Sequence, residues 1–407
     1  MSILRECKDY CLRNDLFSCK EILVGVSGGA DSMCLLDLLC KMKDLGEELP
    51  FFPAISVAHV HHGLRESANF DENIVKAYCE KRDIPLYVCH ADVAREASTR
   101  RIGIEEAGRL VRYGFFTETA SRMKVSREDV FIAVAHHMDD QAETILLNLF
   151  RGAGTDGLCG IYPRNGNLIR PLLFATKEDI LQYVEENSIP FVSDQTNSEN
   201  DYMRNRIRNQ VLPAIMQAIG KNPVPMLART SDLMKADKEY FAGEIAKLMQ
   251  ERLSYTEDGI PFLSVKSFVY EPKAIASRMI RSLFVRRFGD GKDITASQVD
   301  EILSLAQRKP FSGRICLPHH RFAGFEDGVL YYADASENGN TCCISFPLQG
   351  EYLLCPETEE CDVELLDSRA GSKERILFSK NDCHVRILFV ENPDQLVYNN
   401  RTWYCAE

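Results

Sequence analysis

The sequence predicts an α/β fold with a doubly wound parallel sheet, followed by a mostly helical domain and a small C-terminal β-rich domain. Over residues 1–200, short and almost continuously apolar runs alternate with amphipathic helical patterns, which is typical of parallel strands covered on both faces. Near residue 204 the pattern changes to long helical stretches with basic residues on their polar faces. With 407 residues, the chain is long enough for two or three domains.

The expected elements of the first part follow from the apolar runs and from the helical spacing between them. We expect strands at residues 22–27, 54–59, 86–90 and 130–135, and a shorter one at 168–172. We expect helices at residues 31–45, 67–82, 104–122, 139–151 and 176–188. Ligands of an open parallel sheet bind at the C-terminal ends of its strands, so the polar residues that follow the strands are the first candidates for a site.

The expected elements of the later part are longer helices and a β-ribbon. We place the helices at residues 202–219, 225–253, 272–288 and 296–307 and the ribbon at 309–333. Residues 340–407 contain short apolar runs broken by acidic and glycine turns, which indicates a small β-rich domain. We therefore expect three domains, at residues 1–203, 204–335 and 336–407.

Composition favours an ordinary globular protein, with 45% hydrophobic and 27% charged residues. No apolar run approaches the roughly 20 residues that a membrane helix needs, and the first residues carry charges throughout, unlike a secretory signal. The 15 cysteines are scattered, odd in number and form no CxxC pair. We therefore expect a cytoplasmic protein with reduced thiols and without a zinc or iron–sulfur site.

The charge of the chain is unevenly distributed. Its formal net charge is −12, yet residues 204–325 contain 20 Lys and Arg against 12 Asp and Glu, so the remainder carries −20. A basic middle segment in an acidic protein is consistent with a surface that binds nucleic-acid phosphates. A solvated helical surface would give the same count, and charge alone leaves both interpretations open.

The sequence SGGADS follows the first apolar run and opens the first helix. A tight turn there aims backbone N–H groups and the positive end of the helix at one point, which suits a phosphate. Gly28 and Gly29 let the main chain approach the anion closely, and Ser27 and Ser32 add hydroxyl donors. Asp31 would repel a phosphate unless a divalent cation bridged them, so it implies Mg²⁺. The lysine of a Walker A loop is absent.

The sequence HHMDDQAET opens the helix after the fourth expected strand. Asp139 and Asp140 near a helix N-terminus are favourable as caps alone. Together with Asp31 at a neighbouring strand end, they could instead hold Mg²⁺ against a triphosphate. His136 is either a contact to the nucleotide or substrate, or a histidine of the core.

Two groups of arginines have helical spacing. Arg109 and Arg112 lie three residues apart, so they share a helix face that is either solvated or a phosphate clamp. Arg204 and Arg208 share a face while Arg206 points elsewhere. One face could serve a nucleotide and the other a nucleic acid, or the segment is a basic linker helix.

The sequence HVHHGLR, which begins at His59, could be mistaken for a zinc site. Consecutive residues at a strand end point to opposite faces, and no cysteine or carboxylate has ligand spacing beside these histidines. We therefore expect no metal other than Mg²⁺.

Taken in order, six stretches resemble the tRNA(Ile)-lysidine synthetase family of PP-loop ATP pyrophosphatases. They are SGGADS, HVHHGLRESANFDE, GIEEAGRLVRY, AHHMDDQAETILLNLFRGAGTDGL, LIRPLL and SDQTNSENDYMRNRIRNQVLP. The resemblance implies a Rossmann-like PP-loop domain in which ATP adenylates the C2 carbonyl oxygen of the wobble cytidine in an isoleucine tRNA with a CAU anticodon. The amine of free L-lysine then displaces AMP. It implies no membrane, and a homodimer is compatible with it.

The resemblance also implies roles for individual residues. The implied ATP contacts are Ser27, Gly28, Gly29, Ala30, Asp31, Ser32, His59 and His136. The implied catalytic residues are Asp31, Asp139, Asp140, Arg109, Arg112 and Arg204, with Asp31 and Asp140 as Mg²⁺ ligands. The implied tRNA contacts are Arg206, Arg208, Arg281, Arg286 and Arg287. Which aspartate binds the metal, and which accepts a proton or anchors the lysine ammonium, stays open.

Three alternatives remain at this point. A cytidine 2-thiolase of the same superfamily would adenylate the base in the same way and use sulfur as the nucleophile. Such enzymes look cysteine-dependent, often with CxxC pairs, and the absence of CxxC here weighs against this alternative. An RNA-binding protein with an inactive ATP fold would not need an intact SGGADS or HHMDDQ. A PP-loop amidase or ligase with a small substrate would not need the basic segment.

Overall fold

The computed structural model of the protein describes most of residues 2–334 and four later strands. The described residues are 2–46, 49, 51–61, 63, 68–123, 125–192, 203–256, 258–289, 291, 294–308, 313–326, 328–334, 360–366, 373–379, 397–399 and 402–404. They form two compact units, residues 1–238 and 239–407, with the boundary inside one long helix. This boundary lies later in the chain than the one expected after residue 203.

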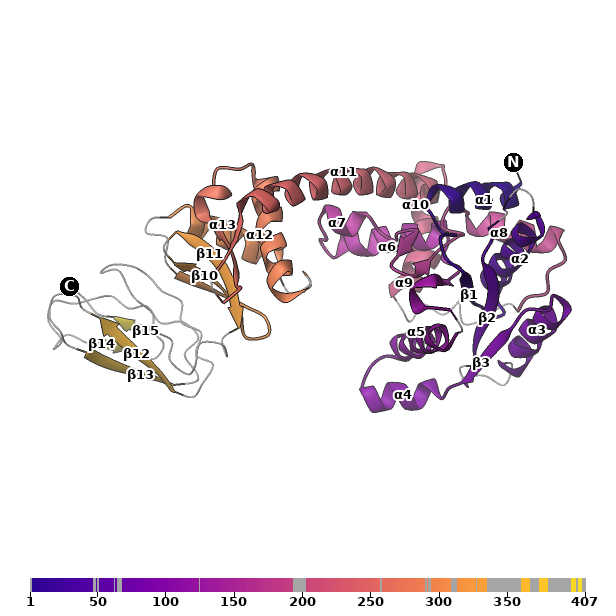
Figure 1. Ribbon diagram of the computed structural model, residues 1–407, viewed down its shortest axis with the longest axis horizontal. Helices are drawn as coiled ribbons and strands as arrows, with labels where there is room; N and C mark the ends of the chain where they lie inside the picture. The colour runs from indigo at the N-terminus through magenta and orange to yellow at the C-terminus, as the bar shows by residue number, and fades with distance from the viewer. Residues whose placement is uncertain are drawn as a thin grey trace. The chain divides into compact units, whose positions relative to one another are not determined.

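A six-stranded sheet forms the centre of the first unit (Figure 1). Its strands, in spatial order, are β3 (Leu86–His90), β2 (Ala54–His61), β1 (Glu21–Gly25), β4 (Val130–Ala133), β6 (Leu168–Ile169) and β5 (Arg164–Asn165). All neighbouring pairs are parallel except the edge hairpin of β5 and β6. The order reverses between β1 and β4, because β2 and β3 lie on one side of β1 and β4 lies on the other.

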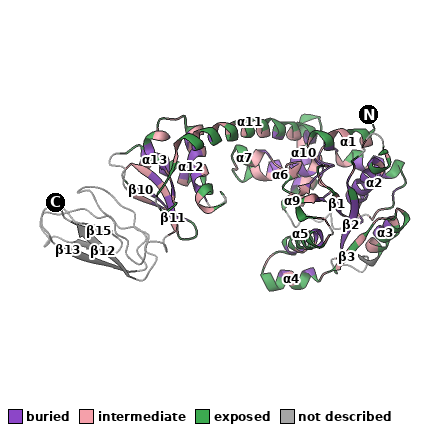
Figure 2. Cartoon of the chain, in the orientation of Figure 1, coloured by how far each residue is buried: buried purple, intermediate pink, exposed green. Residues whose placement is uncertain are grey.

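Helices cover both faces of this sheet. On one face lie α1 (Ile3–Arg13), α2 (Ala30–Asp44), α3 (Ala68–Lys81) and α8 (Lys177–Glu186). On the other face lies α5 (Ile104–Arg122), which follows the short α4 (Val93–Arg100). Side chains of β1 alternate between the two faces of the sheet, and each face has its own hydrophobic core. Ile22 and Val24 belong to the core on the first face, and Leu23 belongs to the core on the second. Figure 2 shows the buried strands between the partly exposed helices.

A separate core joins the start of α6 to the helices after residue 203. It involves α6 (Met138–Phe150), the adjacent α7 (Thr155–Leu158), α9 (Met203–Arg206), the π-helical turn η4 (Ile207–Val211), α10 (Leu212–Ile219) and α11 (Pro223–Arg252). Ala142 and Leu146 of α6 pack against Ile207 and Leu212. Gln141 also donates to Ser231 Oγ of α11 at 2.6 Å. The beginning of the basic region therefore belongs to the first unit.

The second unit combines two helices with an antiparallel sheet. The helices are α12 (Lys273–Phe288) and α13 (Ala296–Ala306). The strands are β7 (Leu253–Tyr255), β8 (Pro261–Ser264), β9 (Gly313–Leu317), β10 (Arg321–Glu326) and β11 (Val329–Asp334), with β12 (Glu360–Leu366), β13 (Lys373–Ser379), β14 (Val397–Asn399) and β15 (Thr402–Tyr404) beyond them. The fully buried Phe284 and Tyr332 pack edge to face at 5.2 Å in its core.

The fold class expected from the sequence is confirmed, and most elements begin and end within two residues of their expected limits. The structure adds α1, α4, α7, β5, β7 and β8, which the apolar patterns did not separate from their surroundings. The expected ribbon is larger, because β7 and β8 extend it to five strands. No helix among the described residues has the length and apolar character needed to cross a membrane.

The turn between β1 and α2 requires a left-handed backbone conformation at Gly28. Gly28 has φ +91°, a conformation that costs an L-residue about 1–2 kcal/mol. A side chain there would also place its Cβ 3.3 Å from the carbonyl oxygen of Asp71. The turn is further held by the hydrogen bond from Val192 N to Gly28 O, 2.9 Å long.

Replacing Gly28 by alanine should therefore lower the free energy of unfolding by about 1–2 kcal/mol, because the left-handed turn is strained. The matched control is Gly114→Ala in the middle of α5, where a Cβ meets nothing within 4 Å. That change should stabilise the protein by up to about 1 kcal/mol. Urea denaturation without nucleotide measures both, and equal effects of the two substitutions would contradict this interpretation of Gly28.

Candidate functional site

The turn after β1 is preorganised by its own hydroxyl groups. Ser27 N donates to Ser32 Oγ at 3.1 Å, and the two hydroxyl oxygens lie 3.2 Å apart. Ser32 Oγ in turn donates to Gly29 O at 3.0 Å. Gly29 caps α2 without a side chain, so the first N–H groups of this helix are not capped by one. This geometry suits an anion at the N-terminus of α2.

The start of α6 brings three carboxylates around one buried histidine. His137 Nε2 lies 3.8 Å from Asp31 Oδ2 and 3.6 Å from Asp140 Oδ2, and its Nδ1 lies 3.6 Å from Asp139 Oδ2. Burial lowers the pKa of His137, but the three carboxylates outweigh burial and raise it overall. The three carboxylates therefore stabilise the cationic form of His137 relative to a free imidazole, where α2 and α6 begin.

Lys177, the first residue of α8, joins the same cluster. Its Nζ donates to Asp31 Oδ1 at 2.5 Å, and its backbone N donates to Asp139 Oδ2 at 2.8 Å. Burial raises the pKa of Asp139, but His137 and this backbone N–H outweigh burial and lower it. One oxygen of Asp139 is thus occupied by α8.

A buried network of ion pairs attaches the arginines of α9 and η4 to α6. Arg204 donates to Glu143 at 2.6 Å and to Asp140 Oδ1 at 2.9 Å. Arg208 donates to Glu143 at 2.6 Å. Asp140 Oδ2 accepts from the backbone N of His137 at 2.9 Å, so both of its oxygens are occupied. Burial raises the pKa of Asp140, but His137 and Arg204 outweigh burial and lower it to about 2.

The two predicted histidines differ in what they can offer. Burial lowers the pKa of His59, and its Nδ1 donates to Val26 O at 2.8 Å, which leaves Nε2 as an unprotonated acceptor. That Nε2 has no hydrogen-bond partner among the described residues. His136 is half-buried and accepts on Nδ1 from Arg170 at 3.3 Å. His59 therefore suits a donor group better than a phosphate oxygen.

The remaining predicted arginines fall into two groups. Arg109, Arg112, Arg206 and Arg286 are exposed, and the guanidinium of Arg109 lies 5.1 Å from the ring centre of Tyr113. The half-buried Arg281 and Arg287 donate to backbone carbonyls, Arg281 to Ile294 at 2.6 Å and Arg287 to Tyr332 at 3.3 Å. Arg208 is likewise committed to Glu143. Exposure alone therefore favours Arg206 and Arg286 as contacts for a polyanion.

The carboxylates at the sheet edge fit Mg²⁺, which binds through one or two carboxylates together with phosphate oxygens. Asp31 and Asp139 each have a partly exposed side chain with one carboxylate oxygen outside their hydrogen bonds to Lys177. The two oxygens of Asp140 are already used, which favours Asp139 as the partner of Asp31. In the part of the chain that the structure describes, no three His, Cys, Asp or Glu side chains form a metal site by themselves.

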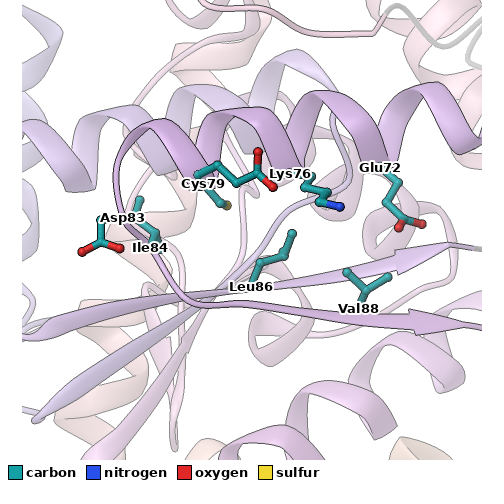
Figure 3. Close-up of a pocket in the computed structure, with 8 residues that line it drawn as sticks. Glu72, Lys76, Cys79, Asp83, Ile84, Leu86 and Val88 are labelled. Atoms are coloured by element: carbon teal, nitrogen blue, oxygen red, sulfur yellow. The ribbon is translucent and has the colours of Figure 1, made fainter.

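A cavity of about 400 Å³ lies elsewhere, between α3 and the edge strand β3 (Figure 3). Its lining includes Glu72, Lys76, Leu86 and Val88. None of the residues expected in the site from the sequence lines this cavity. The sheet edge after β1 and β4 therefore remains the candidate site.

Residues 4–215 of the chain match a protein-family model that is described as a PP-loop domain. The chain belongs to the PP-loop family. The matched range includes the SGGADS turn, the start of α6 and the arginines of α9 and η4.

Within the PP-loop family, curated relatives confirm the resemblance seen in the sequence. The chain is 37% identical over 302 residues to a tRNA(Ile)-lysidine synthase of Clostridium acetobutylicum, covering 74% of this chain and 63% of the relative. It is 33% identical over 299 residues to that of Caldanaerobacter subterraneus, covering 73% and 62%. It is 34% identical over 317 residues to a bifunctional protein TilS/HprT of Listeria innocua, covering 76% and 47%. The chain thus spans between about half and two thirds of these relatives.

The sequence assigned no role to four residues that shape this site: His137, Glu143, Lys177 and Arg170. Glu143 had a usable signal, because Asp140 and Glu143 share a face of α6 at a spacing of three residues, as Arg204 and Arg208 share a face at a spacing of four. Lys177 had none, since its contact with Asp31 depends on how α8 packs on α2.

Replacing Glu143 by glutamine should lower the free energy of unfolding by about 3 kcal/mol, because two arginines lose a fully buried carboxylate. The control is Glu96→Gln, which removes an exposed pair with Arg100 and should change stability by less than about 1 kcal/mol. Urea denaturation at neutral pH compares them. If the two variants unfold alike, the buried ion pairs do not hold α9 and η4 on α6.

Proposed function

We propose that this chain ligates lysine to C2 of the wobble cytidine in an isoleucine tRNA with a CAU anticodon, and converts ATP to AMP and pyrophosphate. The observation that carries the proposal is the convergence of the anion-binding turn after β1, the acidic start of α6 and Arg204 at one sheet edge. The names of the curated relatives supply the substrates.

The first step joins the base to AMP. The C2 carbonyl oxygen of the cytidine attacks the α-phosphorus, and the bond from that phosphorus to the oxygen bridging to the β-phosphate breaks, releasing pyrophosphate. Ser27, Ser32 and the N–H groups that begin α2 receive the phosphates. Arg204, held by Asp140 and Glu143, offers positive charge to the α-phosphate. Mg²⁺, when bound by Asp31 and Asp139, would neutralise charge on the leaving pyrophosphate.

The second step forms the bond to lysine. The ε-amine attacks C2, the bond from C2 to the adenylate oxygen breaks, AMP leaves with the electron pair, and the nitrogen loses a proton. Asp139 has a lowered pKa, so it is a weak proton acceptor. We therefore assign Asp139 to binding Mg²⁺ rather than to proton transfer, a choice that the sequence left open.

Recognition of the tRNA rests on the basic region. Arg206 and Arg286 are exposed, and we assign them contacts to phosphates, which position an RNA without reading its sequence. Arg281 and Arg287 contribute to the fold through their backbone partners and add to the surface charge.

Sulfur transfer is less well supported than lysine transfer. Burial raises the pKa of the Cys40 thiol to about 11 and that of Cys79 to about 12. Burial also raises the pKa of Cys34, on the helix that follows the turn. A thiolate nucleophile needs the opposite shift, so the described thiols with a shift do not favour a cytidine 2-thiolase.

Incubation with labelled lysine, ATP and bulk bacterial tRNA tests the proposal. We expect ATP-dependent label in RNA and one AMP released for each lysine incorporated. Asp31→Ala should reduce pyrophosphate release by roughly 100-fold or more, because it removes the ligand beside the leaving group. Binding of tRNA should change little.

The matched control is Asp44→Ala, which removes an exposed aspartate near the other end of the same helix and should keep the wild-type rate. Label in RNA without AMP release, or a wild-type rate for Asp31→Ala, would refute the proposed chemistry.

A further inference from the structure

Arg170 is a buried cation that contacts His136 of the candidate site. It follows β6 in the LIRPLL stretch and is 8% exposed. Its backbone N donates to Pro163 O at 2.8 Å, and its NH1 donates to Tyr162 O at 2.7 Å. The first bond fixes the backbone of Arg170, and the second fixes its guanidinium, on the segment between α7 and β5. Its Nε then donates to His136 Nδ1 at 3.3 Å.

This contact determines which nitrogen of His136 carries the proton. A guanidinium has no acceptor atom and stays protonated in proteins, so Nδ1 of His136 must present its lone pair. The proton of the neutral ring then lies on Nε2. Burial lowers the pKa of His136 to about 4. The positive charge of Arg170 lowers this pKa further, whereas the negative charge of Asp140 raises it. The ring is thus neutral at physiological pH.

The arrangement at His136 is the reverse of that at His59. A backbone carbonyl receives Nδ1–H of His59, whereas a guanidinium donates to Nδ1 of His136. Two strand ends of one sheet therefore present an acceptor nitrogen from β2 and a donor N–H after β4.

We propose that Arg170 is a positioning residue that fixes His136 as the Nε2–H tautomer, so that this histidine donates to an oxygen of the bound nucleotide or of the adenylated base. The nature of this acceptor rests on the proposed function, while the tautomer itself does not. Tyr162, whose backbone oxygen accepts from Arg170, also contacts α11, because Lys235 and Lys238 lie 5.5 and 5.6 Å from its ring centre.

Nitrogen NMR of the full chain with ring-labelled histidine tests the tautomer directly, and subtraction of the His136→Ala spectrum assigns the signals. We expect an unprotonated Nδ1 and a protonated Nε2 for His136 in the wild type. Arg170→Met should replace this pattern by an average of both tautomers, and Arg170→Lys should retain it in part. A wild-type Nδ1–H, or an unchanged pattern in Arg170→Met, would overturn the proposal.

Kinetics then test whether Arg170 acts through His136. Arg170→Met should slow AMP release by roughly 10- to 100-fold, the loss found when a residue that orients a metal-ligating histidine is removed. In the His136→Ala background the same change should have less than a twofold effect. An undiminished loss in that background would show that Arg170 acts on the fold rather than on His136.

The experiments distinguish a failure of the proposed lysine transfer from a failure of the proposed His136 tautomer. A correct tautomer in a protein that transfers no lysine would refute the proposed function and leave the assignment of His136 standing. If Arg170→Met does not fold, the wild-type spectrum and the Arg170→Lys variant still decide the question.

Discussion

The pairing of β1 with β4 is the constraint on which the site depends. The two strands run parallel, with Glu21 opposite Val130 and Val24 opposite Ala133, so the helices that follow them begin at the same edge of the sheet. The strand order reverses at this pair, and such a reversal leaves a crevice where a ligand binds. The SGGADS turn and the HHMDD sequence therefore meet although more than 100 residues of chain separate them.

Charge compensation allows so many carboxylates to meet at that edge. Asp31, Asp139 and Asp140 surround His137, and Lys177 and Arg204 supply further positive charge. The same contacts attach three separate elements, α8, α9 and η4, to the helices that carry the aspartates. A nucleotide with its cation would enter a site whose own charges are already balanced, so binding need not first overcome repulsion among bare carboxylates.

Sequence patterns predicted the sheet and its helices well because each strand is buried and each helix is amphipathic over several turns. They failed for α4, which is eight residues long, and for β7, which is three residues long. They also missed α1, whose buried face is marked by Cys7 and Cys11 among many charged residues. In the site, the motifs located Ser27 to Ser32 and Asp139 to Asp140, since these residues sit directly after strands. Arg170 and Lys177 could not be located in this way, because their roles arise from contacts with residues 34 and 146 positions away.

A crystal structure with ATP and Mg²⁺ tests most directly whether the edge between β1 and β4 binds the nucleotide. We expect the triphosphate to accept hydrogen bonds from the backbone of residues 27–32, with the cation between the phosphates and the carboxylates of Asp31 and Asp139. A nucleotide bound elsewhere, for example between α3 and β3, with the turn after β1 left empty, would contradict the account.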